Sequence, residues 1–319
     1  MSELITIGEP LVVFASTEPD VSVQDSINFN KGIGGAELNV AIGTRRLNHS
    51  VSYLGAVGAD PQGRFIIDQI QRKQINTNYL YESIKYMTGY QMKQLVSHGD
   101  PKVYNFRKDS AASHITPANL SSLDLKNVKF AHLTGILPAI SSDALATCLF
   151  LAKKANQEHI TLTFDPNLRP ALWENKAKMI KTINYLASFA NIVLPGQSEG
   201  KILTGSDDPD DIADFYLKNE QTQAVFVKIG SKGSFVKVKG HEGDFIPGFK
   251  VNKVVDTVGA GDGYALGVIT ALLENESYQA AARRGNAIGA MQVQVRGDND
   301  GYPTRDKLRK FFTDYGVEV

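Results

Sequence analysis

The stretch Asp256-Thr-Val-Gly-Ala-Gly-Asp-Gly-Tyr-Ala-Leu-Gly267 joins a glycine-rich turn to the start of an apolar helix. It follows Val254-Val255, which has strand-like character. Gly259 and Gly261 let the backbone bend sharply and bring amide N–H groups close to a ligand. A helix N-terminus adds the positive end of its dipole. The segment therefore predicts an anion-binding loop between a strand and a helix.

Asp262 is an unexpected residue for a loop that only binds phosphate, because its charge would repel the ligand. It makes chemical sense as a base that takes a proton from a hydroxyl while the amides stabilise charge on a transferred phosphoryl group. The alternative is an ordinary strand–helix turn with a capping aspartate. The loop is not a Walker A sequence, because no Gly-Lys-Ser/Thr follows.

Around this loop, short apolar runs alternate with longer helical patterns, which is typical of a largely parallel sheet wrapped by helices. The expected strands are Leu4–Ile7, Ser50–Leu54, Val128–Leu133, Thr161–Asp165, Asn191–Leu194, Ala224–Ile229 and Ser234–Val238. The expected helices are Ala36–Leu47, Phe65–Lys73, Ser142–Asn156, Lys176–Ala190, Pro209–Lys218, Gly261–Glu274, Tyr278–Val295 and Thr304–Tyr315. No linker divides the chain into separate domains.

Two segments break this rhythm. Leu11–Phe29 and Tyr86–Phe106 alternate between apolar and polar residues, which favours antiparallel strands with one covered face. They predict a small sheet that protrudes from the main domain as a lid over a cleft. A closing lid would keep water away from a reactive phosphoryl group.

Composition limits the class of protein. Apolar residues make up 42% of the 319 residues, enough for a substantial core, and 34 Lys and Arg balance 34 Asp and Glu. This balance gives no reason to expect nucleic acid or a membrane as partner. The single cysteine, Cys148, lies in an apolar helical run and is expected to be buried. No signal peptide or membrane-spanning run is visible, so a cytoplasmic protein is expected.

Two widely separated motifs carry a family resemblance. The segment Asp256–Asp262, together with Gly34-Gly-Ala-Glu-Leu-Asn39, resembles the ribokinase-like (PfkB) carbohydrate kinases. The resemblance runs from Ile5 to about Thr304. It implies a Rossmann-like, three-layer α/β/α fold in one kinase domain, with a β-sheet lid from about 11–35 and 85–111. It also implies the use of ATP and Mg²⁺.

The same resemblance assigns roles in the glycine loop. It implies that Asp262 is the catalytic base and that the backbone amides of Gly259, Ala260, Gly261 and Asp262 form the anion hole. Without the resemblance, the choice between this reading and a capped turn stays open.

At the other motif, Gly32-Ile-Gly-Gly-Ala-Glu-Leu-Asn39 departs from a dinucleotide-binding loop, because the full Gly-x-Gly-x-x-Gly pattern is missing and a polar segment precedes it. In the resembled family Gly34 and Gly35 pack against a sugar, and Asn39 hydrogen-bonds its hydroxyls. The alternative for Glu37 and Asn39 is that they cap and orient the helix start.

Three further stretches look like the 2-keto-3-deoxygluconate kinases within that family. They are Gly8-Glu-Pro-Leu-Val-Val13, Tyr104-Asn-Phe-Arg-Lys-Asp-Ser-Ala-Ala-Ser113 and Arg296-Gly-Asp-Asn-Asp-Gly-Tyr-Pro-Thr304. The segment Asp165–Trp173 fits as well, although fructokinases share it. This substrate carries a carboxylate that neutral sugars lack.

Two arginines are candidates to hold such a carboxylate. Arg107, at the end of a lid strand, could grip it through two parallel hydrogen bonds. Arg169 follows the strand Thr161–Asp165, where parallel sheets place ligand sites, and could hold the substrate or steady the γ-phosphate. For each arginine, a surface ion pair is the alternative.

Further candidates, for contacts with substrate hydroxyls, are Gln91, Tyr104 and Asn105. Strand alternation places Asn105 on the same face as Arg107. By the resemblance, Asp298 binds the far end of the sugar acid. For Asp298, an exposed turn aspartate is the alternative.

Nucleotide contacts are expected elsewhere. Val225–Ser234 has the pattern of a strand, a glycine turn and a second strand. The resemblance implies that Lys228, Gly230 and Gly233 lie near the phosphates or ribose and that Asn286 lies near the adenine. From the sequence alone, the turn is an ordinary hairpin and Asn286 a solvated helix residue.

The segment Pro195-Gly-Gln-Ser-Glu199 corresponds to the Asn-x-x-Glu metal motif of the family, with glycine in place of the asparagine. Glu199 can still orient Mg²⁺ through water, since Mg²⁺ usually keeps several waters. Asn167 could supply the missing amide. A monovalent cation near Asp256 is left open. Open lid edges favour a homo-oligomer.

The sequence thus predicts a kinase that makes 2-keto-3-deoxy-6-phosphogluconate from ATP and 2-keto-3-deoxygluconate. A fructokinase or other neutral-sugar kinase of the same family is the main alternative. A sugar- or nucleotide-binding protein without turnover is a further alternative, against which Asp262, Gly259 and Gly261 argue.

Overall fold

A central sheet runs through the molecule, and the computed structural model describes it within residues 2–97 and 101–317. In order across the sheet, its strands are β13 (Asp244–Pro247), β12 (Gly233–Val238), β11 (Ala224–Lys228), β10 (Ile192–Val193), β9 (Thr161–Asp165), β8 (Phe130–Thr134), β1 (Leu4–Ile7), β4 (Val51–Gly58) and β5 (Asn76–Ser83). The strands from β11 to β5 pair in parallel, while β12 and β13 are antiparallel.

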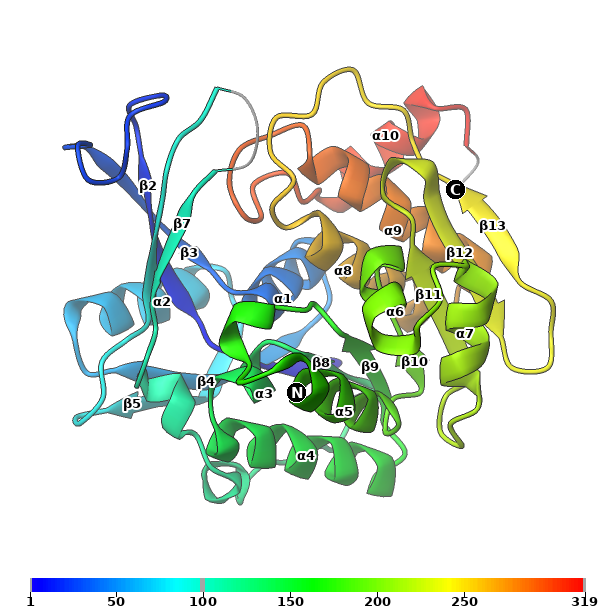
Figure 1. Cartoon of the computed structure of the whole chain (residues 1–319), viewed down its shortest axis with the longest axis horizontal. Coiled ribbons are helices and arrows are strands. Elements are labelled where there is room, and N and C mark those ends of the chain that lie inside the picture. Colours follow the sequence, from blue (N-terminus) through cyan, green and yellow to red (C-terminus); the bar gives the residue numbers. More distant parts are fainter. Residues whose placement is uncertain (1, 98–100, 318–319) are drawn as a thin grey trace.

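Helices cover both faces of this sheet (Figure 1). One face carries α1 (Ala36–Arg46), α2 (Pro61–Arg72), α8 (Ala260–Leu273), α9 (Tyr278–Gln292) and α10 (Arg305–Asp314). The other carries α3 (Leu137–Ile140), α4 (Ser142–Gln157), α5 (Lys176–Ala187), α6 (Gln197–Thr204) and α7 (Pro209–Leu217). Successive strand residues alternate between the two hydrophobic cores, as Leu4 and Ile5 do. The predicted three-layer fold is confirmed.

A second, four-stranded sheet stands beside the main domain and forms the lid. Its order is β3 (Phe29–Gly34), β2 (Leu11–Ser16), β6 (Tyr90–Lys93) and β7 (Val103–Phe106). The chain leaves the main domain twice to build it, once for β2 and β3 and once for β6 and β7 (Figure 1). The central pair, β2 and β6, is parallel and comes from different excursions. The predicted small sheet is confirmed, but its strands are shorter than the alternating segments, and the expectation of antiparallel pairing was wrong for β2 and β6, because they belong to separate excursions of the chain.

Some expectations about single elements were wrong. Val254-Val255 is not a strand, and the two side chains are 56% and 38% exposed in an irregular loop. The strands β5 and β13 and the helix α6 were not expected. β5 lacks an apolar run because it lies at the edge of the sheet, where most of its side chains are only partly buried.

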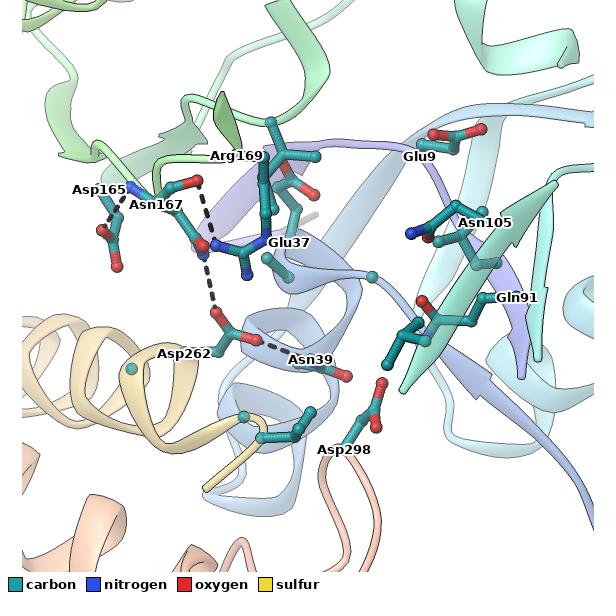
Figure 2. Close-up of a pocket in the computed structure, with 18 of the residues that line it drawn as sticks. Glu9, Glu37, Asn39, Gln91, Asn105, Asp165, Asn167, Arg169, Asp262 and Asp298 are labelled. Atoms are coloured by element: carbon teal, nitrogen blue, oxygen red, sulfur yellow. Dashed lines mark hydrogen bonds between the residues drawn. The ribbon is translucent and has the colours of Figure 1, made fainter. Parts of the chain in front are cut away.

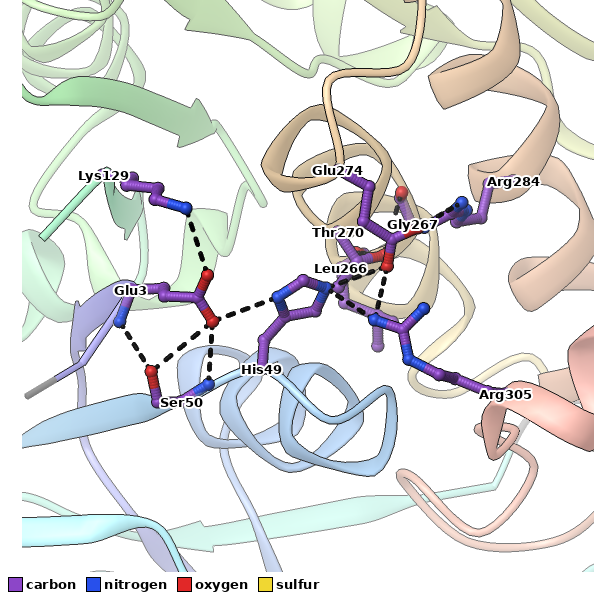
Figure 3. A network of polar contacts seen from close by, with 10 residues as sticks. All are labelled: Glu3, His49, Ser50, Lys129, Leu266, Gly267, Thr270, Glu274, Arg284 and Arg305. Atoms are coloured by element: carbon purple, nitrogen blue, oxygen red, sulfur yellow. Dashed lines mark hydrogen bonds and ion pairs between the residues drawn. The ribbon is translucent and has the colours of Figure 1, made fainter.

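A buried histidine lies at the centre of a polar network that joins the start of β1 to the helices of the last third of the chain (Figure 3). His49 Nδ1 lies 3.2 Å from Glu3 Oε2, and its Nε2 lies 3.0 Å from Glu274 Oε1. Arg284 and Arg305 also contact Glu274, at 2.9 and 2.6 Å. The cluster joins the start of β1 to α8, α9 and α10. His49 thus has a polar structural role.

The Cys148 thiol is buried, as expected. Over the part of the chain that the structure describes, no helix has the length and apolar character needed to cross a bilayer.

Candidate active site

Several acidic and polar side chains line a cavity of about 660 Å³ between the lid and the carboxyl ends of the parallel strands. Open α/β sheets place ligand sites at this edge. Thirteen of the residues that the sequence singled out line it: Gly35, Asn39, Gln91, Asn105, Arg107, Asn167, Arg169, Glu199, Lys228, Gly259, Gly261, Asp262 and Asp298. Residues distant in the sequence thus meet in one place.

Asp262 lies in the first turn of α8 and is 9% exposed. Its Oδ2 accepts a hydrogen bond from Asn39 Nδ2 at 2.8 Å, and its Oδ1 accepts one from Asn167 Nδ2 at 3.2 Å (Figure 2). Burial raises the pKa of the Asp262 carboxyl, against the lowering effects of Asn39, Arg169, Lys228 and Asn167. The carboxylate is therefore fixed in direction and more basic than an exposed aspartate.

The loop before Asp262 requires glycine at one position. Gly259 begins α8 with φ of +77°, in the left-handed region. A Cβ at this position would lie 1.9 Å from the carbonyl oxygen of Asp298. The Tyr302 hydroxyl donates to Gly259 O at 2.7 Å and holds the turn from the other side. Gly261 and Ala260 continue into the first turn of the helix, so their amides lie at its N-terminus.

Asn39 does more than orient its helix. Its Oδ1 accepts from Asn299 Nδ2 at 2.9 Å, which leaves Nδ2 for Asp262. Glu37 is buried and accepts from the Thr134 hydroxyl. Burial raises the pKa of Glu37 to about 7. Neither Glu37 nor Asn39 caps the start of α1, so the helix-capping alternative was wrong for both side chains.

A buried ion pair stands at the ends of β9 and β11. Lys228 Nζ lies 2.7 Å from Asp165 Oδ2. Burial alone would lower the pKa of Lys228, but the negative charges of Asp165 and Glu199 raise it, so the ammonium keeps its charge. A Cβ on Gly261 would lie 3.8 Å from this Nζ, so the charge stands close to the start of α8. The sequence analysis missed Asp165 as a site residue.

Glu199 holds two loops in place. Its Oε1 accepts from Leu168 N and its Oε2 from Gly196 N, both at 2.7 Å. The carboxylate also lines the cavity. Within residues 2–97 and 101–317, no three Asp, Glu, His or Cys side chains group closely enough to hold a metal by themselves. The acidic lining fits an Mg²⁺ held mainly by phosphate oxygens and water.

The lid contributes one face of β6 and β7. Gln91 and Asn105 line the cavity, as alternation with Arg107 predicts (Figure 2). The same alternation turns Tyr104 to the outer face of the lid, where it is 45% exposed and outside the cavity lining. The structure therefore does not bring Tyr104 to this site.

Arg107 is oriented by a carboxylate that the sequence analysis did not single out. Glu9 is 2% exposed, and its Oε2 accepts from Arg107 Nε at 2.6 Å and from Nη2. The Ser110 hydroxyl donates to Glu9 Oε1 at 2.5 Å. Glu9 also lines the cavity. The surface ion pair considered for Arg107 is in fact a buried pair at the rim of the site.

Arg169 has no carboxylate partner among the residues that the structure describes. Its Nη1 donates to Leu168 O at 3.0 Å and to Asn167 O at 3.5 Å, the second of which Figure 2 shows, so the side chain bends back over its own loop. Its charge helps to lower the pKa of Asp262 against the effect of burial. Arg169 therefore lies within electrostatic reach of the Asp262 carboxylate, and its predicted contact with substrate or γ-phosphate stays a prediction.

At the far end of the cavity, Asp298 is 9% exposed and is not the exposed turn aspartate of the alternative interpretation. Burial raises its pKa to about 6, although Lys93 opposes the shift. Lys93 Nζ lies 2.7 Å from Asp256 Oδ2 and 4.0 Å from Asp298 Oδ1. A Cβ on Gly34 would lie 2.6 Å from Asp298 Oδ2, so only glycine fits beside this carboxylate.

Of the residues expected around the nucleotide, Lys228 lines this cavity, whereas Gly230, Gly233 and Asn286 lie apart from it. Gly230 and Gly233 form the turn between β11 and β12, and neither lines it. Asn286 is buried, and its Nδ2 donates to Ile246 O at 3.0 Å and to Pro247 O at 3.2 Å. Asn286 thus holds β13 against α9 and is not a solvated helix residue.

The fold and the site together define a phosphotransferase of the sugar kinase type: a carboxylate at a helix N-terminus under a β-sheet lid. The chain belongs to the pfkB family carbohydrate kinases, whose family model matches residues 1–305. It is 40% identical over 312 residues to the 2-dehydro-3-deoxygluconokinase of Bacillus subtilis (strain 168), covering 98% of this chain and 95% of that protein.

Solved structures agree with this assignment. A PfkB protein from Polaromonas sp. JS666 superposes with a TM-score of 0.89 at 35% identity, over 97% of this chain and 99% of that one. An uncharacterized sugar kinase from Pyrococcus horikoshii, in complex with ATP, superposes with a TM-score of 0.81 at 25% identity, over 96% and 97% of the two chains.

Proposed function

We propose that this chain is a cytoplasmic kinase that transfers the γ-phosphoryl group of ATP to 2-keto-3-deoxygluconate, forming 2-keto-3-deoxy-6-phosphogluconate. The observation that carries the proposal is the position of a cationic side chain, Arg107, in the cavity that also holds Asp262. The relative from Bacillus subtilis acts on this compound under its other name, 2-dehydro-3-deoxygluconate.

The proposed reaction uses Asp262 as the base. Its carboxylate takes the proton of the substrate hydroxyl, the hydroxyl oxygen attacks the γ-phosphorus, and the bond to the bridging oxygen breaks, so that ADP leaves with the electron pair. The amides of Gly259, Ala260, Gly261 and Asp262 lie at the start of α8, where they can stabilise the transferred phosphoryl group. Asn39 and Asn167 orient the carboxylate for this step.

The nucleotide is proposed to lie along the ends of β9 and β11, with its phosphates near Lys228. Gly230 and Gly233 in the neighbouring turn, and Asn286 behind β13, are proposed to shape the ribose and adenine side of this region. An Mg²⁺ bound to the phosphates would neutralise developing charge on them. Glu199 and Asn167 are the oxygen-bearing side chains proposed to hold its waters.

The carboxylate of Asp256, near which a monovalent cation was left open, already has partners. Its Oδ2 contacts the Lys93 ammonium at 2.7 Å, and its Oδ1 accepts from Val258 N at 3.1 Å. A monovalent cation near Asp256 would share this carboxylate with Lys93. The proposed reaction uses ATP and Mg²⁺, and it leaves the place near Asp256 open to a monovalent cation.

The substrate is proposed to lie between the lid and the start of α8. Arg107 would bind the carboxylate of the sugar acid, Gln91 and Asn105 would contact hydroxyls, and Asp298 would bind the far end beside Gly34 and Gly35. Arg169 would steady the charge between substrate and γ-phosphate. Because Glu9 holds Nε and Nη2 of Arg107, the guanidinium is aimed before the substrate arrives.

Replacing Arg107 tests the substrate class. In Arg107→Ala we expect KM for 2-keto-3-deoxygluconate to rise about 100-fold, the loss of a charge-assisted hydrogen-bond pair. For 3-deoxyfructose, which has CH₂OH in place of the carboxylate, we expect a change of less than about 5-fold. Steady-state ADP release with both substrates measures this difference.

The control for that experiment is Glu9→Gln. It keeps the guanidinium and removes its charged partner, so the preference for the acid should persist. A neutral-sugar kinase would lose both activities equally in Arg107→Ala. In that case Arg107 has a structural role and the sugar-acid assignment is wrong.

We also propose that the chain forms a homo-oligomer through the outer face of the lid. This face carries aromatic side chains, with the rings of Tyr90 and Phe106 stacked at 4.7 Å and Phe106 47% exposed. Apolar surface of this kind favours contact with a second copy. We expect Phe106→Lys to lower the mass found by sedimentation, whereas Tyr185→Lys, at an exposed aromatic of α5, should leave it unchanged.

A further inference from the structure

A second cavity lies under the lid, next to the candidate active site. Its volume is about 860 Å³, and it shares only Lys93, Thr257 and Asp298 with the active-site lining. The strands β2 and β3, the ends of α1 and α2, and the loops 254–257 and 296–300 enclose it. The volume lies within the range of pockets that bind small molecules.

The charge of this second cavity is positive. Its cationic side chains are Lys31, Arg46, Lys73, Lys93 and Arg296, and its carboxylates are Asp256, Asp298 and Asp300. Lys93 forms ion pairs with Asp256 and Asp298. Lys31 lies over the Phe65 ring, 4.2 Å from its centroid. Asp300 therefore remains as the one carboxylate of the lining that faces Arg46, Lys73 and Arg296.

Arg46 and Lys73 both line this cavity, and the Arg46 guanidinium is held in place by hydrogen bonds. Arg46 Nη1 donates to Asn299 O at 2.5 Å and Tyr302 O at 3.1 Å, which holds the guanidinium in place. Burial lowers the pKa of Lys73, and the charge of Arg46 lowers it further, against the weaker attraction of Asp300. Among the residues that the structure describes, neither side chain forms an ion pair. Asp300 is thus the one carboxylate of the described lining that offsets these two positive charges, and it compensates them only in part.

We propose that this cavity binds a phosphate group, free or carried by a small metabolite, with Arg46 and Lys73 as its cationic contacts. The free N–H groups of a guanidinium match phosphate oxygens, and an ammonium adds a point charge. An anion between them would relieve their repulsion. Val13, Ile33 and Val255 provide apolar wall for an organic part.

The two cavities meet at Asp298. Its carbonyl oxygen packs against Gly259, and its carboxylate faces Lys93. An anion in the second cavity would attract the Lys93 ammonium as well as the Arg46 guanidinium. It would therefore compete with Asp256 for Lys93, in the ion pair that joins the lid to the loop before α8. A bound phosphate is therefore placed to alter the affinity for the sugar acid.

Isothermal titration with sodium phosphate tests the site. The full chain is first saturated with Mg²⁺ and a non-hydrolysable ATP analogue, so that active-site phosphate positions are filled. Sodium chloride keeps the ionic strength constant. We expect saturable phosphate binding to the wild type and at least a tenfold higher Kd in Lys73→Met. Lys153→Met, at an exposed lysine of α4, is the matched control and should bind as the wild type does.

Glycerol 3-phosphate distinguishes the two sources of phosphate. A lower Kd than that of inorganic phosphate indicates a phosphorylated metabolite, and an equal or higher Kd indicates free phosphate. Thermal unfolding in chloride buffer checks that Lys73→Met is folded, and its kcat without phosphate should match the wild type. The proposal is overturned by an absence of saturable binding to the wild type, or by an equal Kd in Lys73→Met.

Discussion

Asp262→Asn is expected to lower kcat by about three orders of magnitude, the middle of the range for loss of a positioned general base. The amide cannot accept the proton of the substrate hydroxyl. It would also present its NH₂ group to Asn39 or Asn167, both of which now donate to the carboxylate. KM for ATP and for the sugar acid should change only a few-fold, because the base acts in the transition state.

Steady-state ADP release gives kcat, and calorimetry gives substrate affinity in the inactive variant. Asp143→Asn is the matched control, because Asp143 also lies in the first turn of a helix, α4, but is exposed. It should leave kcat unchanged. Near-normal kcat in Asp262→Asn would show that Asp262 is not the base and would favour the alternative that it caps the helix.

Gly259→Ala is expected to lower kcat at least 100-fold, comparable with the removal of an oxyanion-hole donor. The left-handed φ of +77° strains any side chain, and the new Cβ would lie 1.9 Å from Asp298 O. The loop must therefore move, and its amides leave the positions proposed for the phosphoryl group. Because the clash is with backbone, no side-chain rotation can relieve it.

Gly205→Ala is the control that introduces backbone strain without a steric clash. Gly205 ends α6 with φ of +90°, but a Cβ there would have no atom within 4 Å. The control should lower the free energy of unfolding by about 1 kcal/mol, with kcat unchanged. Rate measurements and thermal unfolding on both variants test the difference. If the two glycine variants keep the same kcat, the loop before Asp262 does not form the anion hole.

Local patterns predicted much of the fold and part of the site. The glycines and apolar run after Asp256 predicted a helix with Asp262 in its first turn, which α8 confirms. Strand alternation placed Asn105 on the face of Arg107, and both line the cavity. These successes share a cause: each depends on residues within a few positions of one another.

Contacts between distant segments were not predictable in this way. Glu9 and Arg107 are 98 positions apart, and Lys93 and Asp256 are 163 apart. No spacing rule links such residues, because the sheet order and the lid decide that they meet. The strand expected at Val254-Val255 was wrong because a local preference was not supported by pairing with a distant strand. Two β-branched residues favour a strand locally, yet no neighbouring strand accepts them.

The lid is attached by four short connections, because the chain enters and leaves it twice: residues 8–10, residue 35, residues 84–89 and residues 107–110. A sheet held by four connections has fewer directions of movement than a flap on a single connection. Glu9 and Arg107 lie in two of these connections and form an ion pair across them. The arginine proposed to bind the substrate therefore also links two of the segments that attach the lid to the main domain.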